Sequence, residues 1–349
     1  MKDQKNNINN KLYFVEFLRI FFIFFIILGH IINRYPDLSE SVFDFFDTKN
    51  MQTTFGVEFF FIIGGFFLYK RLTQKLELSI LIQKYYFRLL PCLFFIFLIC
   101  VFFKLNELYD FPLICSLTSG LSIPGEILGW GDWYVSVYFW CSLLYIYFFI
   151  KLNKHSLFIT LILIYITICI KFHAPHSWMS AYYNLIGSEV IRGIYSIGLG
   201  IIASYISEQI FKKKSIENLF FKLLFTIIEI FSLIAVYNYI VRFNHNHFNF
   251  FEMELVFCLL LISIDNSCGF ISKILNKVSY IYYISRYTYS FFVCHIFFIR
   301  YLFINNFSNL NSFDCALFVI LGTLFLGVFE YHVVEKLFIK FINKKLIRY

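Results

Sequence analysis

Residues 12–33 read LYFVEFLRIFFIFFIILGHIIN, and this stretch decides the fold class. A helix needs roughly 20 apolar residues to cross the hydrocarbon core of a bilayer, which is about 30 Å thick. The stretch is also longer than the apolar core of a secretory signal, and it lacks a small-residue cleavage site. We therefore expect it to remain in the protein as the first membrane-spanning helix.

The composition of the whole chain agrees with a membrane protein. Of its 349 residues, 60% are hydrophobic and only 15% are charged, which excludes an ordinary soluble domain. We expect an all-α polytopic membrane protein, a bundle of about ten transmembrane helices that forms a single domain over residues 1–349. The expected helices lie near 12–33, 53–69, 89–104, 132–150, 156–172, 187–207, 219–241, 251–265, 286–304 and 313–335.

The distribution of positive charge sets the expected topology. Loops on the cytoplasmic side of a membrane carry an excess of lysine and arginine. If the N-terminus lies inside, the segments on the inner side hold 22 of the 30 Lys and Arg residues and the outer loops hold five; the other three lie within helices. One miscounted helix would invert every later loop, so this partition favours ten spans with both termini cytoplasmic. The expected location is the inner (plasma) membrane.

Several other classes of function are disfavoured. A formal net charge of +8 is compatible with nucleic-acid binding, but the basic residues sit in short clusters between apolar segments, so we expect no nucleic acid as a partner. The nine cysteines form no C-x-x-C pair, and neither a disulfide framework nor a zinc site is indicated. His245-Asn246-His247 in an outer loop lacks supporting carboxylates, so no metal site is expected there.

Ionisable residues inside the first expected helix need an explanation, because each costs at least about 2.5 kcal/mol to place in a bilayer. Arg19 and His30 are eleven residues apart, which puts both on one face, about 16 Å from each other along the helix axis. One interpretation is a functional stripe that faces the protein interior. The alternative is that Arg19 pairs with Glu16 and His30 lies near the outer interface.

Other expected spans also carry ionisable groups, and a bundle surrounded by lipid must gather them inward. Such a group of polar side chains favours a catalytic or transport site. Two of these residues, Glu330 and Glu335, can equally lie at an interface. The residues are Glu58, Arg192, Glu229, His295, Arg300, Glu330 and Glu335.

These residues resemble the pattern of a known family. Arg19 followed by His30 looks like the signature of the membrane acyltransferase-3 family, the bacterial O-acetyltransferases of surface polysaccharides. Residues 56–66, GVEFFFIIGGF, are similar to its G-V-[DE]-L-F-F-x-x-S-G-F motif, with Gly64 in place of the serine. Residues 87–91 (FRLLP), 133–134 (WY), 289–295 (YSFFVCH) and 334–336 (VEK) resemble further elements. Tyr85 replaces an arginine of the family, and Leu337 replaces a proline.

The resemblance implies an integral membrane O-acyltransferase that moves an acyl group, by family default acetyl, from cytoplasmic acyl-CoA to a hydroxyl of a cell-surface or lipid-linked glycan. His30 is the expected general base, because a neutral imidazole with a pKa near 6.5 accepts a proton at physiological pH. An acyl-histidine intermediate is also open. Arg19 is expected to orient the donor or to offset negative charge. Glu58 or Glu335 can fix the imidazole tautomer, or can instead pair with an arginine.

Four basic residues of the inner side suit the phosphates of coenzyme A: Lys70, Arg71, Lys84 and Arg88. Ordinary positive-inside anchoring explains them equally well. Arg192, His295, Glu335, Trp133 and Tyr134 are expected to bind substrate or support the site, with His295 as a packing or hydrogen-bonding partner. No permanently bound cofactor is expected, and the oligomeric state is open. The expected partners are acyl-CoA, the glycan and the lipid bilayer.

The main alternative is a polysaccharide or lipid-linked glycan exporter or flippase without catalysis, in which buried Arg and His line a passage. A transporter more often shows symmetric repeats or helix pairs broken by Gly and Pro, and neither is visible in this sequence. A structural subunit of a membrane complex is a further alternative. It would not need so many ionisable groups inside the membrane.

Overall fold

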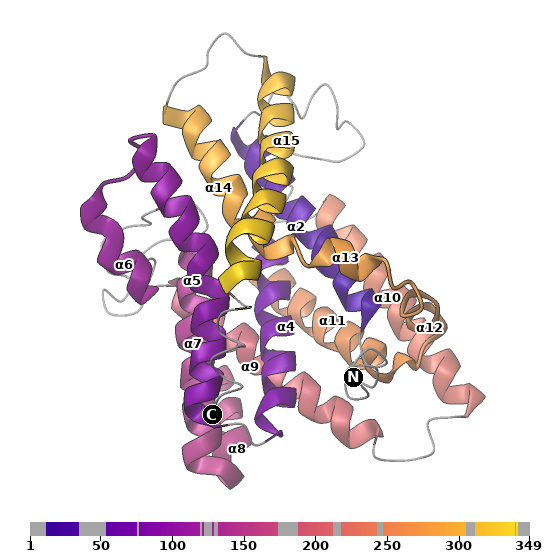
Figure 1. Cartoon of the computed structure of the whole chain (residues 1–349). Helices are drawn as coiled ribbons and strands as arrows, with labels where there is room; N and C mark the ends of the chain where they lie inside the picture. The colour runs from indigo at the N-terminus through magenta and orange to yellow at the C-terminus, as the bar shows by residue number, and fades with distance from the viewer. Residues whose placement is uncertain are drawn as a thin grey trace.

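A computed structural model describes residues 12–34, 54–74, 77–118, 121, 128, 132–173, 188–211, 218–242, 247–304, 311–338 and 340. Within these ranges every regular element is helical (Figure 1). The α-helices are α2 (Tyr13–Arg34), α4 (Thr54–Leu72), α5 (Leu78–Phe102), α6 (Phe111–Ser116), α7 (Asp132–Leu152), α8 (Ser156–His173), α9 (Ser188–Phe211), α10 (Leu219–Arg242), α11 (His247–Ile264), α12 (Phe270–Leu275), α13 (Ile281–Ser285), α14 (Thr288–Ile304) and α15 (Ser312–Glu330). Short turns are η2 (Leu108–Asp110), η3 (Asn153–His155), η5 (Asp265–Ser267) and the π-helical η6 (Tyr331–Glu335).

Six helices of the described part are long and apolar enough to cross a membrane, and two shorter ones are apolar as well. The protein is therefore an all-α, multi-pass membrane protein. The expected count of ten spans and the cytoplasmic position of both termini stay predictions, and residues 1–11 and 341–349 lie outside the described part. The six are Tyr13–Ile32, Leu78–Phe102, Asp132–Leu152, Glu189–Phe211, Leu219–Ile240 and Ser312–Phe338, and the shorter two are Ser156–Ile170 and Thr288–Leu302.

Helix α5 begins at Leu78, well before the span expected near 89–104. The added turns place Leu81, Tyr85 and Leu89 on a buried side, while Lys84 and Arg88 are exposed. This alternation follows the helical period, so the basic segment continues directly into the apolar one as one helix. The basic side chains are thereby held at fixed positions relative to the membrane-spanning part.

Burial separates central helices from peripheral ones. The apolar windows of α2 and α9 are 56% and 61% buried, whereas those of α10 and α15 are 22% buried. Since lipid tails solvate apolar side chains, the exposed apolar faces of α10 and α15 are suited to contact with lipid. Helix α2 packs against α4, α13 and α14, so the residues of its inner face meet several other helices.

Helices α4 and α9 pack against each other at close range through two glycines. A Cβ atom added at Gly65 would lie 2.0 Å from the carbonyl oxygen of Ile197, and one added at Gly200 would lie 2.0 Å from that of Ile62. Small residues let helix backbones approach closely in membranes, where packing rather than the hydrophobic effect drives association. The two glycines therefore fix the position of α4 relative to α9.

Replacing Gly200 with leucine is expected to prevent this packing, because the new side chain would overlap the backbone of α4. We expect a large loss of folded protein, measured as the monodisperse fraction in detergent. The control is Ile206→Leu on the same helix, where the side chain is 40% exposed and the folded yield is expected to stay at the wild-type level. A Gly200→Leu variant that folds normally would mean that α4 and α9 are farther apart.

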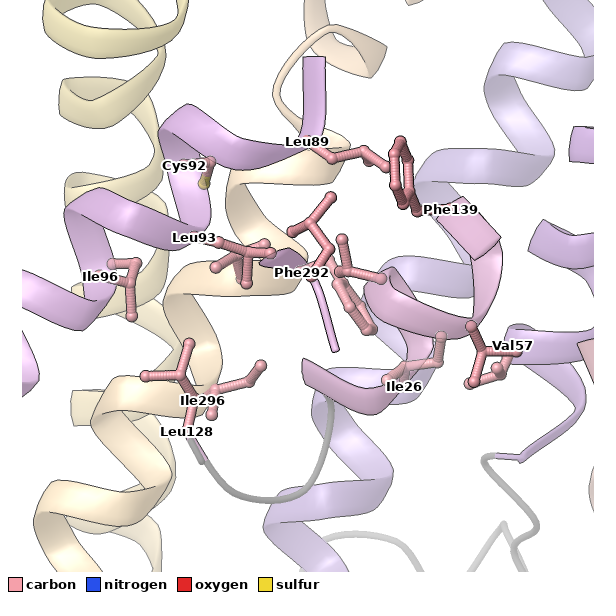
Figure 2. Packing of buried hydrophobic residues seen from close by; sticks show 14 of the residues in the cluster. Ile26, Val57, Leu89, Cys92, Leu93, Ile96, Leu128, Phe139, Phe292 and Ile296 are labelled. Atoms are coloured by element: carbon pink, nitrogen blue, oxygen red, sulfur yellow. The ribbon is translucent and has the colours of Figure 1, made fainter. Parts of the chain in front are cut away.

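Side chains of α2, α4, α5, α7 and α14 meet in one apolar core. Figure 2 shows part of it, in which Ile26, Val57, Leu93, Phe139 and Phe292 come from these five helices. All five side chains are buried. The same five helices also surround a cavity, so this core fixes the geometry of its walls.

Candidate functional site

A cavity of about 300 Å³ lies among α2, α4, α5, α7 and α14. On α4 its lining runs from Arg71, near the end of the helix, back to Phe60. The two residues are eleven positions apart, which corresponds to about 16 Å along the helix axis. The residues contributed by α2 and α14 come from the first turns of those helices. The cavity thus connects one end of the bundle with its interior.

Four cationic side chains line the cavity, and they come from three different helices. They are Arg19 of α2, Arg71 of α4, and Lys84 and Arg88 of α5. Among the carboxylates of the described residues, Glu16 alone lines it. The Arg71 guanidinium lies 5.5 Å from the ring centroid of Tyr85, at a cation–π distance. A concave site with this excess of positive charge is suited to an anion such as a phosphate.

Arg19 is held by two partners at the wall of the cavity. It donates to the Glu16 carboxylate at 2.8 Å and to the Thr288 hydroxyl at 3.0 Å. The ion pair with Glu16 considered from the sequence is therefore present, and Arg19 lines the cavity all the same. Two fixed partners restrict the rotamers of the long side chain, which prepares the guanidinium for an incoming group.

Aromatic rings line the inner part of the cavity. The Tyr134 ring lies 5.2 Å from that of Phe292 and stacks on that of Tyr138 at 6.0 Å. Tyr138 also occupies the space beside Gly64, where an added Cβ would lie 2.3 Å from the tyrosine ring. Glycine at this position, in place of the serine in the family motif, makes room for the Tyr138 side chain.

The rings of Tyr134, Tyr138 and Phe292 form an aromatic wall of the cavity. Two histidines lie directly behind this wall. The rings of His30 and His295 are 5.4 Å apart between centroids, with an interplanar angle of 29°. The His295 ring lies 5.6 Å from that of Phe292, which lines the cavity. Phe292 thus contacts both the cavity and His295, whereas neither histidine lines the cavity itself. Arg19 and His30 both face α14, through Thr288 and His295, so α2 presents both to the interior.

Glu58 and Arg192 form a buried ion pair. The guanidinium of Arg192 donates to both carboxylate oxygens of Glu58 at 2.8 and 2.9 Å, and Glu58 is 1% exposed. Arg192 also lies 5.0 Å from the ring centroid of Trp133. The alternative of an ion pair for Glu58 is the one observed. This arrangement connects α4, α7 and α9.

Replacing Glu58 with glutamine is expected to destabilise the protein by about 3–5 kcal/mol, the range for removal of one partner from a buried pair. The double variant Glu58→Gln, Arg192→Gln removes both charges and should recover most of that stability. Thermal unfolding in detergent measures both. A double variant no more stable than the single one would show that the pair does not set this stability.

Lys70 is the one residue of the expected phosphate-binding set that does not line the cavity. It pairs instead with Asp265, which also accepts a hydrogen bond from Ser207 at 2.6 Å. Its ammonium lies 4.9 Å from the ring centroid of Phe66. These contacts connect α4, α9 and η5, so the position of Lys70 fits a structural role.

Three further acidic or basic residues lie in other surroundings. Glu335 is 7% exposed and accepts a hydrogen bond from Ser290 at 3.3 Å, but it does not contact the histidine pair in any interaction described. Glu229 accepts from the backbone amides of Ile271 and Ser272, at the start of α12. Arg300 donates to Asn106 at 2.8 Å. None of the three lines the cavity, but Glu335 lies close enough to Arg88 and Arg19, two of the cavity cations, to interact with their charges.

Three lining residues escape analysis of the sequence. Tyr138 follows Tyr134 by four residues, a helical spacing that in retrospect predicts a shared face. Thr288 precedes His295 by two helical turns. A single polar residue at the start of a helix does not indicate a functional site. Phe292 falls within residues 289–295, which resemble a family element, but nothing in that stretch distinguishes it from the chain's other phenylalanines.

No group of three or more His, Cys, Asp and Glu side chains lies in a position to hold a metal ion within the part of the chain that the structure describes. His245 and Asn246 lie outside the described residues. All nine cysteines are free thiols.

Comparison with known proteins identifies the family. A search of the curated proteins and one of the solved structures found no match. A family model described as an acyltransferase domain matches residues 12–331, which includes every helix that lines the cavity and nearly the whole chain. The protein therefore belongs to the acyltransferase-3 family and is an acyltransferase of the membrane.

Proposed function

We propose that this acyltransferase is an O-acyltransferase of the inner (plasma) membrane that moves an acyl group, acetyl by the resemblance, from cytoplasmic acyl-CoA to a hydroxyl of a cell-surface or lipid-linked glycan. One observation carries the proposal. A cavity with four cations in its lining reaches from one end of the bundle to an aromatic wall, and a histidine pair lies directly behind that wall.

The lining of the cavity suits the two ends of an acyl-CoA molecule. The cations Arg71, Lys84 and Arg88 lie where α4 ends and α5 begins, and they can bind the phosphates through charge-assisted hydrogen bonds. The aromatic rings of Tyr134 and Phe292 line the other part, where the uncharged arm and the thioester would lie. The excess of lysine and arginine in the expected inner segments supports entry of the donor from the cytosol.

In this proposal His30 is the general base of the chemical step. The hydroxyl oxygen of the glycan attacks the acyl carbon, and His30 takes the hydroxyl proton. The bond between carbon and sulfur breaks, its electron pair leaves with the sulfur, and His30 passes the proton to that sulfur to give the free thiol. Since Arg19 lies about 16 Å from His30 along α2, Arg19 acts on the phosphate end of the donor and not on the reacting atoms.

The acceptor is proposed to arrive from the opposite side of the membrane. His30 lies close to the end of α2 at Arg34, whereas the cations of the cavity lie level with its beginning at Tyr13. Donor and acceptor therefore approach His30 from opposite ends of the same helix. This placement supports a surface or lipid-linked glycan over a cytoplasmic one.

Deletion of the gene tests the proposal in cells. Mass spectrometry of the surface glycans should show an acyl modification in the parent strain, its loss in the deletion strain, and its return on complementation, with the amount of exported glycan unchanged. Loss of glycan export with normal acylation of the remaining material would instead favour the exporter or flippase. Unchanged acylation and unchanged export would contradict both.

A further inference from the structure

We infer that His295 is the positioning residue of His30: it accepts a hydrogen bond from the protonated ring nitrogen of His30, so that the unprotonated nitrogen is the one that takes the proton. The inference rests on the proposed role of His30 as general base and adds the group that orients it. A general base of this kind acts in one tautomer, which a neighbouring hydrogen-bond acceptor selects.

The backbone of α14 determines which nitrogen of His295 carries the proton. The Nδ1 atom of His295 contacts the carbonyl oxygen of Phe292, one turn earlier in the helix. A carbonyl oxygen can only accept, so Nδ1 is the nitrogen that donates. In a neutral imidazole the other nitrogen, Nε2, then has no proton and is an acceptor. His295 is 1% exposed, so water does not compete freely for that atom.

The relative position of the two rings fits this role. A separation of 5.4 Å between centroids allows facing ring nitrogens to approach to about 3 Å, the length of a hydrogen bond. The carboxylate expected from the sequence to orient His30 is engaged elsewhere, because Glu58 binds Arg192 through both of its oxygens. Glu335 accepts from Ser290. His295, by contrast, has its ring next to that of His30.

An uncharged orienting group suits this place. Burying a carboxylate beside His30 would carry a large desolvation cost, whereas a neutral imidazole carries no such cost. When His30 takes a proton, the added positive charge is shared through the hydrogen bond with Nε2 of His295. The two rings thus act as one proton-holding unit between the cavity and the outer end of α2.

Kinetics of the purified protein test this inference. His295→Leu is expected to lower kcat for acyl transfer by about 10²-fold or more, the usual contribution of an oriented acid–base group, with the KM for acyl-CoA unchanged. The unchanged KM separates positioning of His30 from a general loss of structure, because the cationic part of the cavity is intact. The matched control is Cys294→Ala, which is equally buried on the same helix and should leave kcat unchanged.

Two conservative variants decide the question if His295→Leu fails to fold. In His295→Gln the amide oxygen reaches the position of Nε2 and can still accept from His30, whereas in His295→Asn it reaches only the position of Nδ1. We expect the glutamine variant to keep a substantial share of kcat and the asparagine variant to lose it. Equal kcat values in the two would overturn the inference.

Measurement of His30→Ala in the same assay distinguishes a failure of the role proposed for His295 from a failure of the role proposed for His30. An inactive His30→Ala together with a fully active His295→Leu would overturn the role of His295 alone. A fully active His30→Ala would remove the proposed base itself, whatever the behaviour of His295.

Discussion

Replacement of His30 with alanine is expected to lower kcat for acyl transfer by at least about 100-fold, because general acid–base catalysis contributes about 10²–10⁴-fold. The variant removes the proposed base behind the cavity but leaves the cations that bind the donor. Its KM for acyl-CoA should therefore stay close to the wild-type value. Transfer of a radiolabelled acyl group by the protein in lipid nanodiscs measures both constants.

The control for this variant lies on another side of the same helix. Phe24 precedes His30 by six residues and is 41% exposed, so Phe24→Ala should insert normally and transfer the acyl group at the wild-type rate. If the two variants lose the same fraction of activity, the loss reflects damage to α2 and not removal of a base. Wild-type activity in His30→Ala would eliminate the proposed mechanism.

Removal of the positive charges in the cavity is expected to weaken donor binding. Hydrogen bonds to charged groups contribute about 1.5–3 kcal/mol each, and every 1.4 kcal/mol corresponds to about tenfold in affinity. Each of the variants Arg71→Gln, Lys84→Gln and Arg88→Gln should therefore raise the KM for acyl-CoA by about tenfold or more. The rise should be smaller at high salt, because ions screen the wild-type attraction as well.

Two comparisons show whether the rise in the KM for acyl-CoA comes from lost contacts with its phosphates. Acyl-pantetheine has the same thioester and arm without the phosphates, so its KM should be high in the wild type and hardly change in the three variants. Arg286→Gln removes a cation that stacks on Tyr283 and Tyr287 outside the cavity, and it should leave the KM for acyl-CoA unchanged. If the three variants raised the KM for acyl-CoA and the KM for acyl-pantetheine equally, the phosphates would not bind to these three cations.

The fold class follows from the sequence because lipid imposes strong constraints. Long apolar runs such as 12–33 can only be buried helices, and the described part of the chain is helical with six evident spans. Other features depend on contacts between distant residues. The close approach at Gly65 and Gly200 joins segments that are more than a hundred residues apart in the sequence, and no local sequence pattern predicts it.

For the candidate site too, the sequence predicts which residues share a helix face but not which partners they meet on other helices. The helical period places Arg19 and His30 on one face of α2, and both do contact α14. The period alone does not say which partner each residue meets. Glu58 was a candidate partner of His30 but binds Arg192, and Lys70 was grouped with the cavity cations but binds Asp265. Choices between such partners depend on helix packing, which single residues do not encode.

The most direct test of the account uses sealed vesicles that contain the purified protein. Radiolabelled acyl-CoA is enclosed inside, and the glycan acceptor is added outside. The account predicts that the label appears on the external glycan and that His30→Ala prevents this. Label that reaches the glycan only when donor and acceptor share one side of the membrane would contradict it.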